Sequence, residues 1–254
     1  MSDDSLRWSG RNSEKDTLRA SVWAALENAG AGIGELFDSI PDFKGAEIAA
    51  EKISQLSFWK EARVIKSNPD APQIPLRYRA LRDGKFLYMP VPELAQDYPF
   101  VLLDPAELTR KGVTFEEGAT IAGALKHGRP VQFREMMPMD VLCVGCVAVT
   151  RHGGRTGKGG GFADLELGIF REVGTIPAHG KIVTTVHELQ VVPNDQLPMQ
   201  GHDSPLDWIV TPSEVIETKT PFPQPRGVAW DFVQPDQYRD IPFLAALRAE
   251  LGNR

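Results

Sequence analysis

The chain has 254 residues, a formal net charge of −6 and a hydrophobic fraction of 42%. This length suits one large domain, and the apolar fraction is enough for a sizeable core. The negative charge argues against nucleic acid as the main partner. No stretch approaches the roughly 20 apolar residues of a membrane span, and the polar start lacks a secretory signal. We therefore expect a soluble, cytoplasmic protein. We also expect a monomer or homodimer, although composition does not decide between the two.

The first part of the chain predicts a loose segment followed by a helix. Residues 1–12 are polar, so we expect a flexible N-terminus there and a single α/β domain over 13–254. Leu18, Val22 and Leu26 then recur at helical spacing and indicate one buried face.

Lys15 and Arg19 lie four residues apart in this helical segment. Residues at this spacing share one helix face, so the two cations lie side by side. Such a pair most often covers a solvated surface, and the alternative is that it binds an anion.

Strand-like and helical runs alternate along the rest of the chain. Helical patterns cover 42–56, 76–82 and much of 104–128, and the last helix is expected over 242–251. The expected strands are 64–65, 86–91, 100–103, 131–134, 140–150, 181–192, 208–210 and 215–218. This alternation predicts a mainly parallel sheet that is covered by helices on both faces.

Cys143 and Cys146 form a C-x-x-C within the apolar run 140–150. On one strand the two side chains would point to opposite faces, which does not suit a chelate or a disulfide. We expect both to be core residues in a reducing compartment.

A glycine-rich loop follows that same run. Six glycines lie within residues 153–161, together with Arg155 and Lys158. Glycine permits positive φ, which lets successive amides line one concavity, and a helix that begins just after the loop adds its positive end. These groups suit a polyphosphate, and Asp164 can hold the accompanying Mg²⁺.

The loop departs from the two common phosphate motifs. Lys158 is followed by Gly159 rather than by Ser or Thr, and the third glycine of a dinucleotide fingerprint would fall on Phe162. The plain alternative is a flexible surface hairpin. The preceding strand and the carboxylate just beyond the loop favour a nucleotide site of another family.

Four collinear motifs resemble the 5-formyltetrahydrofolate cyclo-ligase family, the methenyltetrahydrofolate synthetases. The most specific is RTGKGGGFAD at 155–164, which is similar to the family pattern R-x-G-[RK]-G-x-G-[YF]-x-D. The other three are K-x-x-x-R at Lys15 and Arg19, Gly84-Lys85 before a strand that ends in proline, and the HDSPLD segment at 202–207.

The resemblance implies a three-layer α/β/α fold with a mainly parallel sheet, of the type shared with ribose-5-phosphate isomerase and coenzyme A transferases. It also implies an enzyme of one-carbon metabolism that uses ATP and Mg²⁺. In this family ATP phosphorylates the formyl oxygen of 5-formyltetrahydrofolate, and a neighbouring amine closes the ring. The products are 5,10-methenyltetrahydrofolate, ADP and phosphate.

Carried over by position, the resemblance assigns roles to thirteen residues of this chain. The expected ATP contacts are Lys15, Arg19, Arg155, Gly157, Lys158, Gly159, Gly160 and Gly161, with Arg155 and Lys158 also catalytic. The expected Mg²⁺ ligands are Asp164 and Asp203. The expected contacts to the organic substrate are Asp70, Phe162 and His187.

Some positions depart from the family pattern. Ala163 replaces the second of two aromatic residues, and Asp70 is the sole carboxylate of 68–73. His187 lies in a strand-like run, where a lone histidine is more often structural. The segments around Asp70 and His187 look more like a paralogous branch that is linked to thiamin metabolism.

Two alternatives to a folate enzyme follow. One is a cyclo-ligase-like paralogue in thiamin metabolism without folate activity, and the other is a non-catalytic nucleotide-binding protein. Sugar-phosphate isomerisation or coenzyme A transfer would rest on analogy of fold alone.

Overall fold

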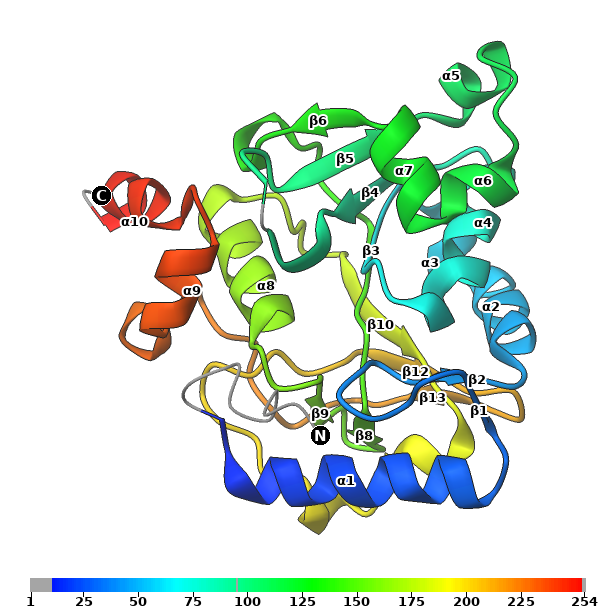
Figure 1. The fold of residues 1–254 in the computed structure, drawn as a ribbon, viewed down its shortest axis with the longest axis vertical. Helices are drawn as coiled ribbons and strands as arrows, with labels where there is room; N and C mark the ends of the chain where they lie inside the picture. Colours follow the sequence, from blue (N-terminus) through cyan, green and yellow to red (C-terminus); the bar gives the residue numbers. More distant parts are fainter. Residues whose placement is uncertain (1–10, 95, 253–254) are drawn as a thin grey trace.

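A computed structural model describes residues 11–94 and 96–252 (Figure 1). At its centre is an eight-stranded sheet whose five middle strands are parallel, while β13, β5 and β6 run antiparallel to their neighbours. In sheet order the strands are β13 Val215–Glu217, β12 Trp208–Val210, β10 Lys181–Thr185, β7 Val141–Cys143, β3 Val64–Ser67, β4 Phe86–Pro90, β5 Phe100–Leu103 and β6 Arg129–Val131.

Helices pack against both faces of this sheet. The described helices are α1 Ser13–Asn28, which lies against the smaller sheet described below, α2 Ala46–Ser54, α3 Ser57–Glu61, α4 Ile74–Arg82, α5 Pro105–Arg110, α6 Phe115–Ala119, α7 Ile121–His127, α8 Phe162–Val173, α9 Pro235–Asp240 and α10 Leu244–Gly252. Successive strand residues point to opposite faces, so Val64 joins the core cluster beneath α8 and Ile65 joins the one beneath α2 and α4. The mixed α/β fold and the mostly parallel sheet are confirmed.

Two long runs that we expected to be single strands are each divided between two sheets. The run 140–150 forms β7 and then β8 Ala148–Thr150, and the run 181–192 forms β10 and then β11 Val191–Val192. The second halves pair with each other in a small sheet that also contains β9 Arg155–Thr156. The prediction of continuous strands was wrong because hydrophobic periodicity does not mark where a fully buried chain changes sheets.

Gly145 lies at the break between β7 and β8. A Cβ atom added there would lie 2.6 Å from Asp70 Oδ2, so only glycine lets the chain pass this close to that carboxylate. Cys143 and Cys146 flank this glycine. Both thiols are free and buried, and burial raises the pKa of each, which confirms them as core residues.

The first helix carries its cations to the edge of the small sheet. The side chain of Asn12 caps α1 by accepting a hydrogen bond from the Lys15 backbone N–H, and Leu18, Val22 and Leu26 pack with residues that include those of β8. Residues 1–10 of the expected flexible N-terminus lie outside the described residues. A further small hairpin pairs β1 Gly32–Ile33 with β2 Asp42–Phe43, which replaces the expected start of the second helix.

The chain beyond residue 212 returns to α8. It adds β13 to the sheet edge and then carries α9 and α10 to the side of α8 that faces away from α2 and α4 (Figure 1). Among the described residues, no helix has the length and apolarity needed to cross a membrane.

Candidate functional site

A pocket of about 580 Å³ opens at the carboxyl ends of β3, β4 and β7. The carboxyl edge of a parallel sheet is where α/β proteins usually bind ligands. The glycine loop, the start of α8, the start of α1 and the C-terminal segment form its walls. The sequence-predicted residues that line it are Lys15, Arg19, Asp70, Arg155, Gly157, Lys158, Gly159, Gly160, Gly161, Phe162, Asp164 and Asp203.

The glycine loop has the backbone that its sequence predicts. Gly159 and Gly161 have φ of 112° and 68°, values that favour glycine, and Gly161 is the N-cap of α8. The loop amides therefore meet the positive end of a twelve-residue helix at the pocket wall. We call this side, with the cations described below, the phosphate end, after the ligand that its sequence predicts.

Arg19 supports the loop from beneath. Its guanidinium donates to the Gly157 carbonyl at 2.6 Å and to Thr156 Oγ1 at 2.7 Å, and it pairs with Asp16. Arg19 is therefore engaged in holding the loop, and its predicted contact with phosphate stays a prediction.

Arg155 joins the loop to α8 and to the 202–207 segment. It is 2% exposed, and its guanidinium donates to Asp164 Oδ1 at 2.5 Å and to the Ser204 carbonyl at 2.9 Å. Burial opposes its charge, but Asp164 outweighs this and raises the pKa of Arg155, so the guanidinium stays charged.

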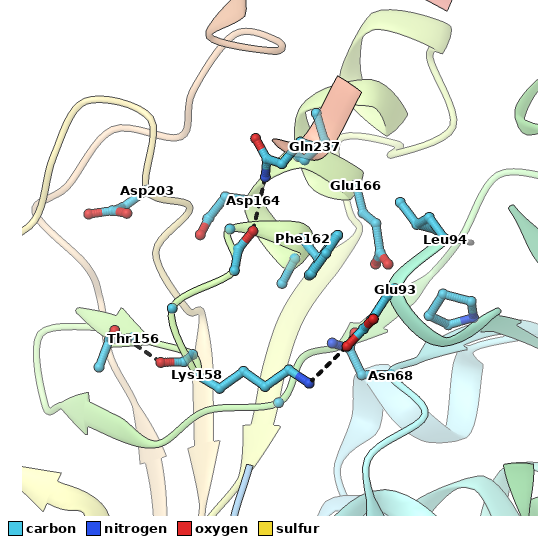
Figure 2. A pocket seen from close by; sticks show the side chains of 18 of the residues that line it. Asn68, Glu93, Leu94, Thr156, Lys158, Phe162, Asp164, Glu166, Asp203 and Gln237 are labelled. Carbon is cyan, nitrogen blue, oxygen red and sulfur yellow. Dashed lines mark hydrogen bonds and ion pairs between the residues drawn. The ribbon is translucent and has the colours of Figure 1, made fainter. Parts of the chain in front are cut away.

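The two predicted metal ligands lie close to each other. Asp164 Oδ1 accepts the backbone N–H of Ser204, the residue after Asp203, at 2.8 Å. Asp203 Oδ2 lies 2.5 Å from Lys15 Nζ, and both side chains are buried. Figure 2 shows both aspartates beside the loop. Only the resemblance predicted that Lys15, Asp164 and Asp203 share one site, and the salt bridge between Lys15 and Asp203 was not predicted.

Asp164 and Asp203 suit a magnesium ion that is also coordinated by the phosphate groups of a nucleotide. No cluster of three or more His, Cys, Asp or Glu side chains in the described chain could hold a metal by itself. Mg²⁺ bound to nucleotides commonly takes one or two carboxylates, and phosphate and water complete its octahedron. Asp164 engages Arg155 through Oδ1, which leaves its Oδ2 for a cation. Asp203 engages Lys15 through Oδ2, while its Oδ1 faces His202 Nε2 at 3.9 Å.

Lys158 reaches across the pocket mouth. Its Nζ lies 3.8 Å from Glu93 Oε1, and a third of its side chain stays exposed (Figure 2). Glu93 and Leu94 have φ of 56° and 57°, in the left-handed region that residues other than glycine rarely adopt. Such strain is common where a turn is held at a functional site.

The opposite side of the pocket, which we call the inner end, contains a charged pair that sequence reasoning missed. Lys66 Nζ lies 2.5 Å from Glu166 Oε2, with 0% and 4% of the two side chains exposed. Lys66 also donates to Asn68 Oδ1. Glu166 and Asn68 line the pocket, and Figure 2 shows Glu166 beside Phe162.

Asp70 lies next to this pair. Burial raises its pKa, although Lys158, Arg77 and Lys66 partly offset the effect. Arg77 is fully buried and donates to the carbonyls of Asn68 and Asp70, which fixes the turn that carries both side chains. Burial also lowers the pKa of Arg77 to about 10.

Glu166 had one signal in the sequence. It follows Phe162 by four residues, so the two share a face of α8, and Phe162 was already a predicted substrate contact. Its partner Lys66 lies a hundred residues earlier, and their distance depends on how α8 crosses β3.

His187 is not among the residues that line the pocket. It caps the short 3₁₀ turn Glu188–Gln190, where its Nδ1 accepts the Leu189 backbone N–H at 3.2 Å. Its ring packs edge-on against Phe43. This placement suits the structural alternative and gives no support to a contact with substrate.

The fold and the pocket define a mixed α/β protein with a loop-lined site at the carboxyl edge of its sheet. Residues 11–212 match the 5-formyltetrahydrofolate cyclo-ligase family. The chain belongs to this family of ATP-dependent ligases.

Similar proteins from other organisms support this family assignment. A methenyltetrahydrofolate synthase domain-containing protein of Bos taurus is 35% identical over 236 residues, which are 92% of this chain and 62% of that protein. The chain thus spans less than two thirds of this relative. The 5-formyltetrahydrofolate cyclo-ligase of Escherichia coli K12 is 32% identical over 149 residues, 56% of this chain and 72% of that enzyme. The NMR structure of Aquifex aeolicus 5,10-methenyltetrahydrofolate synthetase shares the fold, with a TM-score of 0.50 and 22% identity over 81% of this chain and 93% of that one.

Proposed function

We propose that the protein is a Mg-ATP-dependent cyclo-ligase that phosphorylates a formyl or amide oxygen of its substrate and so drives ring closure. One observation carries the proposal: the glycine loop and the Lys15–Asp203 and Arg155–Asp164 pairs surround one pocket that also has a separate inner end. A nucleotide and an organic substrate therefore have adjoining places. We also infer the three-layer arrangement of ribose-5-phosphate isomerase and coenzyme A transferases.

The chemistry needs positioning more than covalent help. The formyl oxygen attacks the γ-phosphorus of ATP and ADP leaves, after which the neighbouring amine attacks the activated carbon and phosphate leaves. With 5-formyltetrahydrofolate the ring-closed product is 5,10-methenyltetrahydrofolate. Holding the reacting atoms together and neutralising phosphate charge supply most of the acceleration in phosphoryl transfer.

The residues at the phosphate end have distinct roles in this proposal. The amides of Gly157 to Gly161 and the ammonium of Lys158 bind the phosphate oxygens, while Arg155 holds Asp164 in place. Asp164 and Asp203 hold Mg²⁺, which neutralises phosphate charge when it is bound.

The inner end receives the organic substrate. Phe162 offers an aromatic wall, and the carboxylates of Asp70 and Glu166 offer hydrogen-bond acceptors to a heterocycle with N–H donors. Because of the charged Lys66–Glu166 pair at this end, a heterocycle other than folate is also a candidate substrate, including one of thiamin metabolism.

Calorimetry with Mg-ATP, followed by calorimetry with 5-formyltetrahydrofolate, tests the proposal. We expect both to bind, and we expect the mixture to form the methenyl product, which is followed by its absorbance. Binding of ATP without folate would favour the paralogue with another substrate. Failure of ATP to bind, with and without Mg²⁺, would overturn the proposal.

A further inference from the structure

The part of the chain beyond the family match completes the pocket. The matched residues end at 212, yet the later chain supplies a continuous stretch of pocket wall. Its lining residues are Gly227, Val228, Ala229, Phe232, Val233, Gln234 and Gln237.

This segment is fastened to the helix that carries Asp164. The Val228 backbone N–H donates to Glu172 Oε1 at 2.8 Å. A Cβ atom added to Gly168 would lie 3.0 Å from the Gly227 carbonyl oxygen, so the two backbones touch there. Residues of α10, including Leu244 and Leu247, then enter the main core cluster.

Gln237 links this segment to the glycine loop. Its Nε2 donates to the Gly160 carbonyl at 2.9 Å (Figure 2). Its Oε1 accepts the Gln234 backbone N–H at 3.0 Å. The residue is 7% exposed. Both ends of the amide are used, so its orientation is fixed by its partners.

The bond acts on the middle of three successive glycines. In a trans peptide the C=O and the following N–H point in opposite directions, so fixing the Gly160 carbonyl also fixes the Gly161 N–H on the other side of the same plane. Glycines have the largest backbone freedom to lose when a ligand orders them. A loop that is already ordered before the ligand binds has a higher affinity, because the conformational entropy has been lost beforehand.

We propose that Gln237 is a positioning residue that presets the Gly161 amide, and with it the glycine loop, for a triphosphate. This inference rests on the proposed function of the loop as the phosphate site. The competing explanation is that Gln237 only caps α9 through its bond to Gln234.

Two variants separate the two roles. Gln237→Glu keeps an oxygen that accepts the Gln234 N–H but has no donor for Gly160, whereas Gln237→Leu loses both bonds. Arg239→Ala, on the same helix, is the control because that side chain is 69% exposed and pairs with Asp240. Thermal unfolding by circular dichroism checks that each variant is folded.

Two readouts are expected to move together. In the ligand-free protein, both Gln237 variants should speed hydrogen–deuterium exchange at the amides of 157–161. Both should raise the Kd for Mg-ATP about fivefold, the effect of losing one buried hydrogen bond, and leave the affinity for 5-formyltetrahydrofolate unchanged. The Gln237→Glu charge also repels phosphate, so Gln237→Leu sets the size of the ATP effect.

Unchanged loop exchange, or an equal loss of affinity for both ligands, would overturn the role of Gln237. If Gln237→Leu does not fold, the exchange measured on Gln237→Glu decides the matter alone. Failure of the wild type to bind ATP would instead overturn the phosphate site itself, and the exchange experiment would still show whether Gln237 orders the loop.

Discussion

The two ends of the pocket are built in opposite ways. The phosphate end uses the backbone of one short loop, and most of its cations lie beside partly exposed acids, the buried Lys15–Asp203 pair being the exception. Partial burial raises the pKa of Asp16 there, but bonds from Arg11 and Arg19 outweigh it and lower that pKa. At the inner end burial prevails and raises the pKa of both Glu166 and Asp70.

The difference shows what each end can tolerate. Backbone amides can donate to a ligand whatever side chains surround them. The loop therefore needs only small residues and a few hydrogen bonds that hold it in place. A buried ion pair is stable only while both partners are present, because a single charge left in a low-dielectric interior is strongly unfavourable. Substitutions should therefore damage the inner end through folding, whereas substitution of the partly exposed Lys158 at the phosphate end should act through binding.

The largest effect is expected at Lys66. Replacing it in Lys66→Met leaves Glu166 buried without a counter-charge, which should lower the free energy of unfolding by about 3–5 kcal/mol. Urea denaturation followed by circular dichroism measures this change.

The double variant Lys66→Met/Glu166→Leu is the matched test. Removing both charges should recover most of the lost stability, since an apolar pair of similar size avoids the unpaired charge. Arg110→Ala, which breaks an exposed pair with Glu107, should cost less than about 1 kcal/mol. A double variant no more stable than the single one would show that the pair is not what stabilises this end.

The next effect is expected at the phosphate end and in binding alone. Lys158→Ala should weaken Mg-ATP binding at least tenfold, about 1.4 kcal/mol, the scale of one charge-assisted contact. Its partly exposed side chain implies little loss of stability. Calorimetry measures the affinity, and Lys126→Ala, on an exposed face of α7, is the control. An affinity equal to that of the wild type would remove Lys158 from the site.

The loop geometry at the phosphate end was predictable because the residues that determine it are contiguous in the sequence. The pattern at 155–164 contains the glycines, both cations and Asp164, and a strand and a helix flank it in the sequence as in the fold. The hydrogen-bond partners of its charged side chains could not be predicted from the sequence. That Arg19 bonds to Gly157 depends on how α1 lies beneath the loop.

The inner end was not predictable in the same way. The Lys66–Glu166 pair depends on the packing of α8 over β3, and no local pattern fixes a contact between residues a hundred positions apart. The same limit explains the divided strands, since both halves of 140–150 are buried and equally apolar. Gly145 was the one signal of a break, and a glycine inside a strand pattern is the usual mark of a close backbone approach.

The smallest expected effect sharpens the electrostatic contrast between the two ends. Because burial raises the pKa of Asp70, the folded protein binds a proton there more readily than the unfolded chain does. Between the ordinary pKa of about 4 and the raised value, the wild type therefore loses stability with rising pH, and Asp70→Asn does not. Urea unfolding at pH 4 and pH 7 should show Asp70→Asn gaining on the wild type at the higher pH. Since the remaining carboxylates are common to both proteins, a difference that stays constant or shrinks would mean that Lys66, Arg77 and Lys158 outweigh burial, and that the inner end resembles the phosphate end after all.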